Sequence, residues 1–214
     1  MPHPTWTAPD LTPDDLIACA ALCRDTLAPV RDRDWSLPAG DLEWSCRYAI
    51  DHVADALLIY AGHLATRAPS RRPRPRTGDP ARSPADLLSV VETAAAILAA
   101  VVRAAPPGAR GFHGSGMADA TGYLGMAGTE ILIHTDDIAA GFGIPFAGSD
   151  DLAAKIVARI FPWTPAGVPA WAALRWSAGR AALPGHPRQD EHWDWHCAPL
   201  AEWDGASQPT APLG

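Results

Sequence analysis

Apolar residues recur at intervals of three and four along several stretches of the chain, which is the spacing of one buried face of an α-helix. The first such stretch follows Thr12-Pro13-Asp14-Asp15, which combines an N-cap hydroxyl, a proline and two acids. Its apolar positions are Leu16, Cys19, Ala20, Cys23 and Leu27. We predict a first helix that ends near Leu27.

The same pattern predicts two more helices. The second begins after Trp44, with Ser45 as its N-cap, and continues to about Leu64. The third begins at Ser83-Pro84-Ala85-Asp86, where the capping pattern is repeated, and ends before Pro106. Residues 68–82 between them are rich in proline and arginine, so we predict a flexible connection there.

Residues 108–116 are rich in glycine and lack a helical period, which predicts a loop. A fourth helix is predicted over residues 118–140. It contains Gly122, Gly125 and Gly128, and each costs about 1 kcal/mol relative to alanine. Close approach of another segment or room for a ligand would explain them, and packing is the simpler explanation.

The remainder of the chain predicts short elements. Ser149-Asp150-Asp151 caps a helix that reaches Phe161, residues 169–177 form another, and residues 192–197 form a short strand or an extended tail. We therefore predict an all-α fold in which residues 1–148 form a four-helix bundle. Residues 149–214 are predicted to add helices and an extended tail that pack on the bundle.

The charge composition argues against nucleic-acid binding. Seventeen Lys and Arg against 24 Asp and Glu give a net charge of −7, which argues against a nucleic-acid surface. The arginines of residues 71–76 alternate with prolines, which is more typical of a solvated loop than of a binding patch.

The location of the protein is predicted from its N-terminus and its apolar runs. The first residues lack the profile of a signal peptide, and no apolar run approaches the ~20 residues that span a bilayer. The four cysteines contain no Cys-x-x-Cys pair. We expect a cytoplasmic protein with free thiols and no membrane partner.

Glu130, His134 and Asp137 carry the main chemical signal. Residues three and four apart lie on one face of a helix, so a carboxylate and an imidazole can meet at one point. Their neighbours are mostly apolar, and polar groups buried there are costly unless something binds them. The alternative is an ordinary Glu-His pair on a solvated face.

His52 in the second predicted helix supplies a third ligand. Alone, such a histidine is more typical of a core or boundary position. Bundles, however, build metal sites from inward-facing residues on neighbouring helices. We therefore predict that His52, Glu130 and His134 bind a divalent metal with open coordination positions, as catalytic sites do.

Zinc is the first candidate for this metal, and nickel, manganese or ferrous iron accept the same ligands. Asp137 is predicted to orient His134 or a bound ligand rather than to bind the metal. The alternative is that Asp137 is an acid near the helix end that pairs with an arginine.

Two stretches of sequence resemble a known family. Trp44 to His52 is similar to the Trp-Ser/Thr…His signature of the DinB-like superfamily. Glu130 to Ile138 resembles the Glu-x-x-x-His-x-x-Asp signature of the branch that contains the N-terminal domain of mycothiol-dependent maleylpyruvate isomerase. The resemblance implies a DinB-like four-helix bundle with a divalent metal, often zinc, on His52, Glu130 and His134.

The resemblance also implies an activity. Several members use low-molecular-weight thiols such as mycothiol, so the resemblance implies a metal-dependent thiol S-transferase or thiol-assisted isomerase acting on a small molecule. His113 would be an extra ligand, an acid or base, or only a loop residue. Arg180 would anchor an anionic substrate or bind carbonyl groups at a helix end. Two alternatives stay open: a tailoring enzyme with a Lewis-acid metal and no thiol, and a non-catalytic metal-binding or stress-associated bundle.

Overall fold

The computed structural model describes residues 6–76, 78 and 81–206. The described residues form six α-helices, a two-stranded antiparallel sheet and two short 3-10 helices. The helices are α1 (Pro13–Leu27), α2 (Cys46–Ala65), α3 (Pro84–Ala104), α4 (Ala120–Phe142), α5 (Asp150–Ile160) and α6 (Ala170–Ser177). The strands are β1 (Arg110–His113) and β2 (Gly116–Asp119), and the 3-10 helices are η1 (Ala28–Val30) and η2 (Leu200–Glu202).

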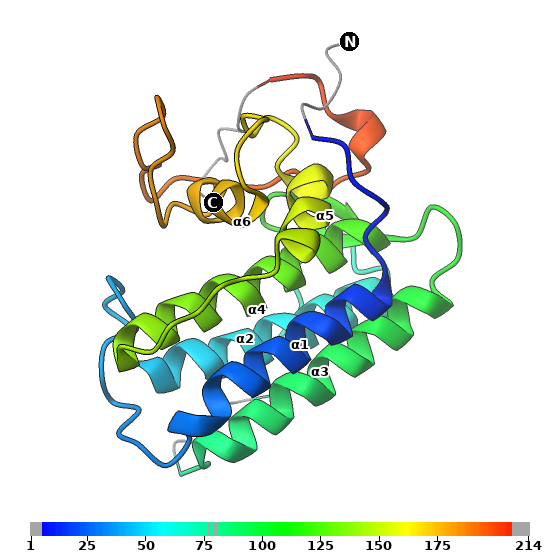
Figure 1. The fold of residues 1–214 in the computed structure, drawn as a ribbon. Helices are drawn as coiled ribbons and strands as arrows, with labels where there is room; N and C mark the ends of the chain where they lie inside the picture. The colour runs from blue at the N-terminus through cyan, green and yellow to red at the C-terminus, as the bar shows by residue number, and fades with distance from the viewer. Residues whose placement is uncertain (1–5, 77, 79–80, 207–214) are drawn as a thin grey trace.

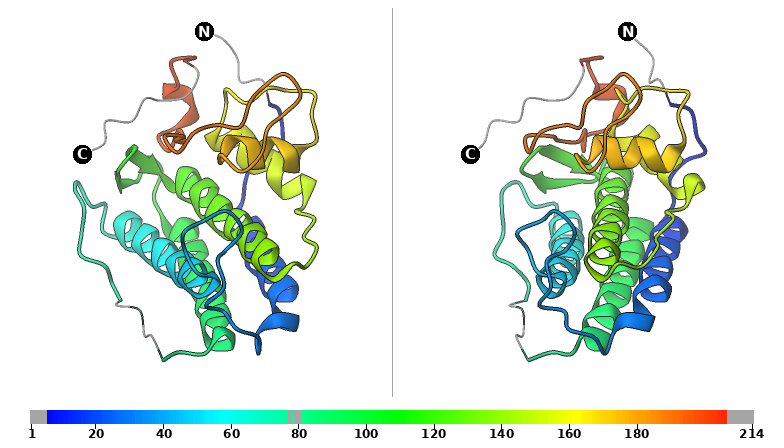
Figure 2. Two further views of the ribbon diagram at one scale, coloured as in Figure 1. Left: turned by 90° about the vertical axis from the view of Figure 1, so that its left-hand side faces the viewer. Right: turned by 60° about the vertical axis from the view of Figure 1, so that its left-hand side comes forward.

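Helices α1 to α4 lie side by side along one another and form a four-helix bundle (Figures 1 and 2). Each of α1 and α2 packs against both α3 and α4, so one core runs along the length of the bundle. Its fully buried side chains include Leu16, Leu27, Ile50, Leu57, Leu98 and Ile131. The predicted all-α four-helix bundle is therefore confirmed.

The predicted helix starts are confirmed by their caps. Thr12 and Asp15 form a reciprocal capping box at the start of α1. Ser45, Ser83 and Ser149 each accept a hydrogen bond from a backbone N–H in the first turn of α2, α3 and α5. These bonds satisfy N–H groups that have no partner within the helix.

The loop predicted at residues 108–116 is wrong in part, because the chain forms a hairpin there. Strands β1 and β2 pair from Arg110 with Asp119 to His113 with Gly116. The backbone N–H of Phe112 also donates to the carbonyl of Ala68 (2.8 Å), which attaches the hairpin to the end of α2. Four-residue strands held by this contact leave no alternating pattern in the sequence. Helix α4 consequently begins at Ala120, two residues later than predicted.

The three glycines in the first half of α4 make room for other segments, as the packing explanation predicted. A Cβ on Gly125 would lie 2.5 Å from Ile160, and one on Gly128 would lie 2.8 Å from Ile156. A Cβ on Gly122 would overlap the carbonyl oxygen of Cys197. Helix α5 and the C-terminal segment therefore lie directly on the backbone of α4.

Gly122→Ala is expected to destabilise the protein by about 1–3 kcal/mol, because the overlapping atom is backbone and cannot rotate away. Gly62→Ala is the matched control, since no atom lies within 4 Å of the added Cβ in the last turn of α2. That control should be stabilising by up to ~1 kcal/mol through helix propensity. Urea unfolding of both variants measures the difference, and equal free energies of unfolding would contradict the packing account.

The C-terminal segment has a turn at residues 191–192 and no regular secondary structure at residues 193–197, so the predicted short strand is absent there. The backbone N–H of His196 donates to the carbonyl of Ile160 (2.8 Å), and that of Asp119 donates to the carbonyl of Cys197 (3.3 Å). Arg159 of α5 pairs with Asp119 and donates to the carbonyls of His196 and Ala198. The segment is thus attached to α5 and to the hairpin, and it brings Trp193 and Trp195 over one side of the bundle.

Residues 68–76 of the connection between α2 and α3 form no helix or strand, and they are attached to α2 rather than only solvated. Arg76 pairs with Asp51 and Asp55, and Arg74 lies 3.4 Å from Asp55. The predictions about residues 1–5, and the end of the tail at 207–214, fall outside the described residues.

Among the described residues, helix α3 is the one helix that meets the length and hydropathy criteria for a membrane span. The helix has 21 residues, and an 18-residue window within it has a mean hydropathy of 1.9, so by length and composition alone it could cross a membrane. In the structure its buried face packs against α1 and α2. Core helices that enter no membrane meet the same two criteria, because one face of such a helix is apolar and the other is rich in alanine.

Candidate metal centre

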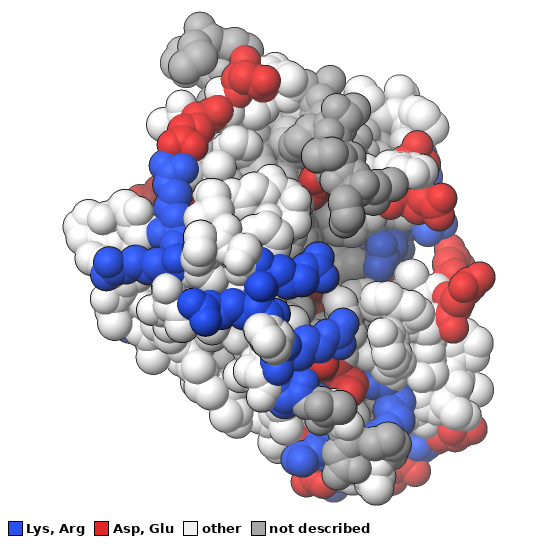
Figure 3. Space-filling model, turned by 180° about the vertical axis from the view of Figure 1, so that it is seen from behind, with Lys and Arg blue, Asp and Glu red and all other residues white. Residues whose placement is uncertain are grey.

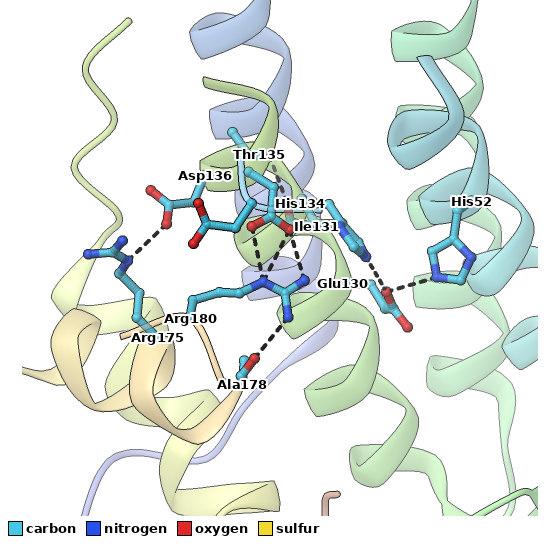
Figure 4. A network of polar contacts seen from close by, with 12 residues as sticks. His52, Glu130, Ile131, His134, Thr135, Asp136, Arg175, Ala178 and Arg180 are labelled. Atoms are coloured by element: carbon cyan, nitrogen blue, oxygen red, sulfur yellow. Dashed lines mark hydrogen bonds and ion pairs between the residues drawn. The ribbon is translucent and has the colours of Figure 1, made fainter. Parts of the chain in front are cut away.

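His52 of α2 and Glu130 and His134 of α4 meet on the inner side of the bundle. One ligand atom from each lies within 4.8 Å of those of the other two. Figure 4 shows both imidazole rings directed at the carboxylate of Glu130. The structure therefore brings together the three residues that the sequence predicted as metal ligands.

The distances among these atoms are compatible with ligands that share one metal ion. Glu130 Oε2 lies 3.3 Å from Nε2 of His52 and 3.3 Å from Nε2 of His134. A hydrogen bond between such atoms is usually about 2.7–3.2 Å long. Two ligands about 2.0–2.1 Å from a tetrahedral metal lie about 3.3 Å apart. Both histidines also present the same nitrogen to the centre, as neutral imidazole ligands do.

Electrostatics keep Glu130 ionised and favour a cation beside it. Burial alone would raise the pKa of Glu130, but hydrogen bonds and charge interactions with His134 and His52 hold it well below its usual range. Burial would lower the pKa of His134, yet hydrogen bonds with Asp137 and Glu130 raise it to about 9. A divalent cation bound here therefore competes with a proton on His134, and its affinity should rise with pH.

Asp137 and Arg180 fix the orientation of His134. His134 Nδ1 lies 3.0 Å from Asp137 Oδ2, so Nδ1 donates its proton to the carboxylate. When the ring is neutral, this leaves the lone pair of Nε2 on the side of Glu130, where a cation would bind. Arg180 donates to both carboxylate oxygens of Asp137, and its Nη1 donates to the carbonyl of Ala178 (Figure 4). Asp137 thus makes both contacts weighed for it, one with the histidine and one with an arginine.

Sequence reasoning missed two aromatic residues at this centre. The hydroxyl of Tyr60 donates to Glu130 Oε1 (3.2 Å), which leaves Oε2 to face the two histidines. Trp44 lies against both rings, with centroid distances of 4.9 Å to His52 and 5.7 Å to His134. Tyr60 follows His52 by eight residues, a helical spacing that could have placed it near the same face.

Two cavities meet at this centre, and both are lined by His52, Glu130 and Trp195. The large cavity has a volume of about 780 Å³, and the smaller one, the arginine cavity, has about 310 Å³. Asp41, Glu43, Asp190, Glu191, Trp44 and Arg180 also line the large cavity. Arg71, Arg72, Arg74, Tyr60, His63 and His113 also line the arginine cavity.

His113 lies beside the centre but outside the group of converging ligand atoms found among the described residues. Its Nδ1 accepts a hydrogen bond from the backbone N–H of Ser115 (3.1 Å), so a neutral ring carries its proton on Nε2. Burial lowers the pKa of His113 to about 4. At neutral pH its ring is therefore a hydrogen-bond donor at Nε2.

A family model described as the mycothiol maleylpyruvate isomerase N-terminal domain matches residues 16–139. The chain belongs to this family. The match covers more than half of the chain and includes His52, Glu130, His134 and Asp137. The bundle is thus the DinB-like bundle that the two sequence signatures predicted. No curated protein and no solved structure matches the chain.

The match to the mycothiol maleylpyruvate isomerase N-terminal domain ends within α4. Arg180, Trp193 and Trp195 therefore come from a segment that the family model does not cover. These residues nevertheless line the large cavity, and Arg180 contacts Asp137. In this member of the family, the segment after α4 completes the surroundings of the centre.

Proposed function

We propose that this protein is a metal-dependent enzyme of the thiol S-transferase or thiol-assisted isomerase type. The metal would be a divalent cation, with zinc the first candidate, held by His52, Glu130 and His134. The observation that supports this most is the spacing of the three ligand atoms at the wall that two cavities share. Membership of the mycothiol isomerase family supports a small thiol such as mycothiol as cosubstrate.

A bound divalent cation would lower the pKa of a coordinated thiol from about 8.5 and so supply a thiolate nucleophile at neutral pH. Neighbouring residues of the chain orient the ligands for such a cation. Asp137 holds the tautomer of His134, Tyr60 orients the carboxylate of Glu130, and Trp44 covers the imidazole rings. His113 would donate a hydrogen bond to the second substrate from the arginine cavity.

The large cavity suits the thiol. Its volume is within the range of about 300–1,000 Å³ that is usual for small-molecule sites. Trp44, Trp193 and Trp195 give it apolar walls, and the acids at its edge offer acceptors for hydroxyl and amide groups. All four cysteines are free and buried, which agrees with a reducing cytoplasm in which such thiols occur.

Calorimetry with mycothiol tests the proposal. Zinc-loaded protein should bind mycothiol saturably, whereas zinc-free protein should not, because the thiol is held through the metal. Equal binding by both forms would contradict a role for the metal in thiol binding. Turnover of an electrophile without any thiol would instead support the Lewis-acid alternative. Purified protein with less than about a tenth of an equivalent of metal, and unchanged melting on zinc addition, would contradict a metalloenzyme.

A further inference from the structure

The arginine cavity is a second compartment at the candidate metal centre, and it differs in charge from the large cavity. It lies between α2, the hairpin and the connection of residues 68–82, and its inner wall is formed by His52 and Glu130. Figure 3, seen from the side opposite to Figure 1, shows Lys and Arg side chains gathered in a band across this part of the surface. Because the whole chain carries a net charge of −7, this concentration of positive charge is local.

The arginines of this cavity fall into two groups. Arg74 pairs with Asp55, as does the neighbouring Arg76, so part of the connection is fixed to α2. Arg71 and Arg72 line the cavity, and within the described residues neither has a carboxylate partner. Both residues are exposed, so their guanidinium groups are available for charge-assisted hydrogen bonds to an anion.

The rest of the cavity adds donors and holds the arginines in place. His63 Nε2 accepts a hydrogen bond from the backbone N–H of Arg72 (3.2 Å), which attaches the backbone of Arg72 to α2. Trp195 is 8% exposed and its indole Nε1–H has no partner within the described residues. His113 presents Nε2 as its free nitrogen. Of the two acids in the lining, Asp55 is engaged by arginines and Glu130 belongs to the candidate metal centre.

The large cavity has the opposite character. Its lining includes the acids Asp41, Glu43, Asp190 and Glu191. Both of its arginines are paired, Arg188 with Asp41 and Arg180 with Asp137. A negatively charged ligand would be repelled from that side and attracted to the arginine side. The two cavities therefore separate ligands by charge on the two sides of one centre.

We propose that the arginine cavity binds the acidic group, a carboxylate or a phosphate, of a small anionic second substrate through Arg71 and Arg72. The substrate would extend inwards past His113, so that its electrophilic part lies at the wall formed by His52 and Glu130. Naming this ligand as the electrophile rests on the proposed function, whereas the anion site itself does not.

Binding of simple anions to zinc-loaded protein tests the site. The probes are maleate, its neutral dimethyl ester and inorganic phosphate, each titrated by calorimetry. Arg71→Ala/Arg72→Ala should weaken binding of at least one anion about tenfold or more, since each guanidinium contributes a charge-assisted hydrogen bond. Arg82→Ala is the matched control, because it removes a charge from the same connection without lining either cavity. It should change the affinity less than about twofold.

Each outcome has a clear meaning. If the double variant binds maleate or phosphate more weakly than wild type but binds the ester equally well, the site is an anion site. The anion whose affinity falls more then identifies the preferred acidic group. If wild-type protein binds neither anion in the millimolar range, or if the double variant binds both as well as wild type, the proposal is wrong. The zinc content of each variant is measured in parallel, because metal loss would concern the proposed function and not the anion site.

Discussion

His134→Ala is expected to lower bound zinc from about one equivalent to less than about a tenth, while the helices stay formed. The substitution removes one of three converging ligand atoms and the only histidine that Asp137 orients among the described residues. The two remaining ligands, His52 and Glu130, come from different helices and cannot hold the cation alone. Metal analysis after dialysis measures the occupancy, and far-ultraviolet circular dichroism measures the helix content.

His113→Ala is the control for this loss. It removes a neighbouring imidazole that lines the arginine cavity but lies outside the group of converging atoms. This variant should keep its zinc, which would also exclude His113 as an extra ligand. Stoichiometric zinc in the His134→Ala protein would refute the assignment of the centre.

Asp137→Ala is expected to weaken zinc binding by about 10–100-fold, although Asp137 is not a ligand. Its carboxylate fixes the tautomer of His134 and balances the half-buried guanidinium of Arg180. Burial alone would raise the pKa of Asp137, but hydrogen bonds with His134 and Arg180 lower it, so it is ionised in the folded protein. Competition with a chromophoric chelator measures the affinity, and wild-type affinity in this variant would contradict the orienting role.

Arg180→Ala separates the two roles considered for that arginine. If Arg180 acts by holding Asp137, the variant should bind zinc more weakly than wild type but more tightly than Asp137→Ala, because the bond from His134 to Asp137 remains. If Arg180 instead anchors a substrate, zinc affinity should be unchanged and only KM should rise. The geometry favours the first result, since Nε and Nη2 both contact Asp137.

The bundle was predictable because its signals are local. Caps such as Thr12 and Ser45 and the apolar spacing of three and four lie within a few residues of one another. The hairpin was not predictable in this way. Its strands are short, and the contact between Phe112 and the carbonyl of Ala68 joins segments 44 positions apart.

The candidate metal centre was partly predictable for the same reason. Glu130 and His134 are one helical turn apart, so the sequence alone places them together. His52 could be added only through the topology of a bundle. The pairing of Arg180 with Asp137 and the position of Trp195 depend on how the segment after α4 packs, and no spacing in the sequence encodes that.

Cobalt substitution tests the central claim most directly, because cobalt(II) reports both the protein ligands and a coordinated thiol in one absorption spectrum. We predict that adding mycothiol to the cobalt-loaded protein produces a thiolate-to-cobalt charge-transfer band in the near ultraviolet. The band should saturate at about one thiol per cobalt and be lost in His134→Ala. A spectrum that does not change on thiol addition, or a band that persists in His134→Ala, would contradict a thiol-binding metal centre at His52, Glu130 and His134.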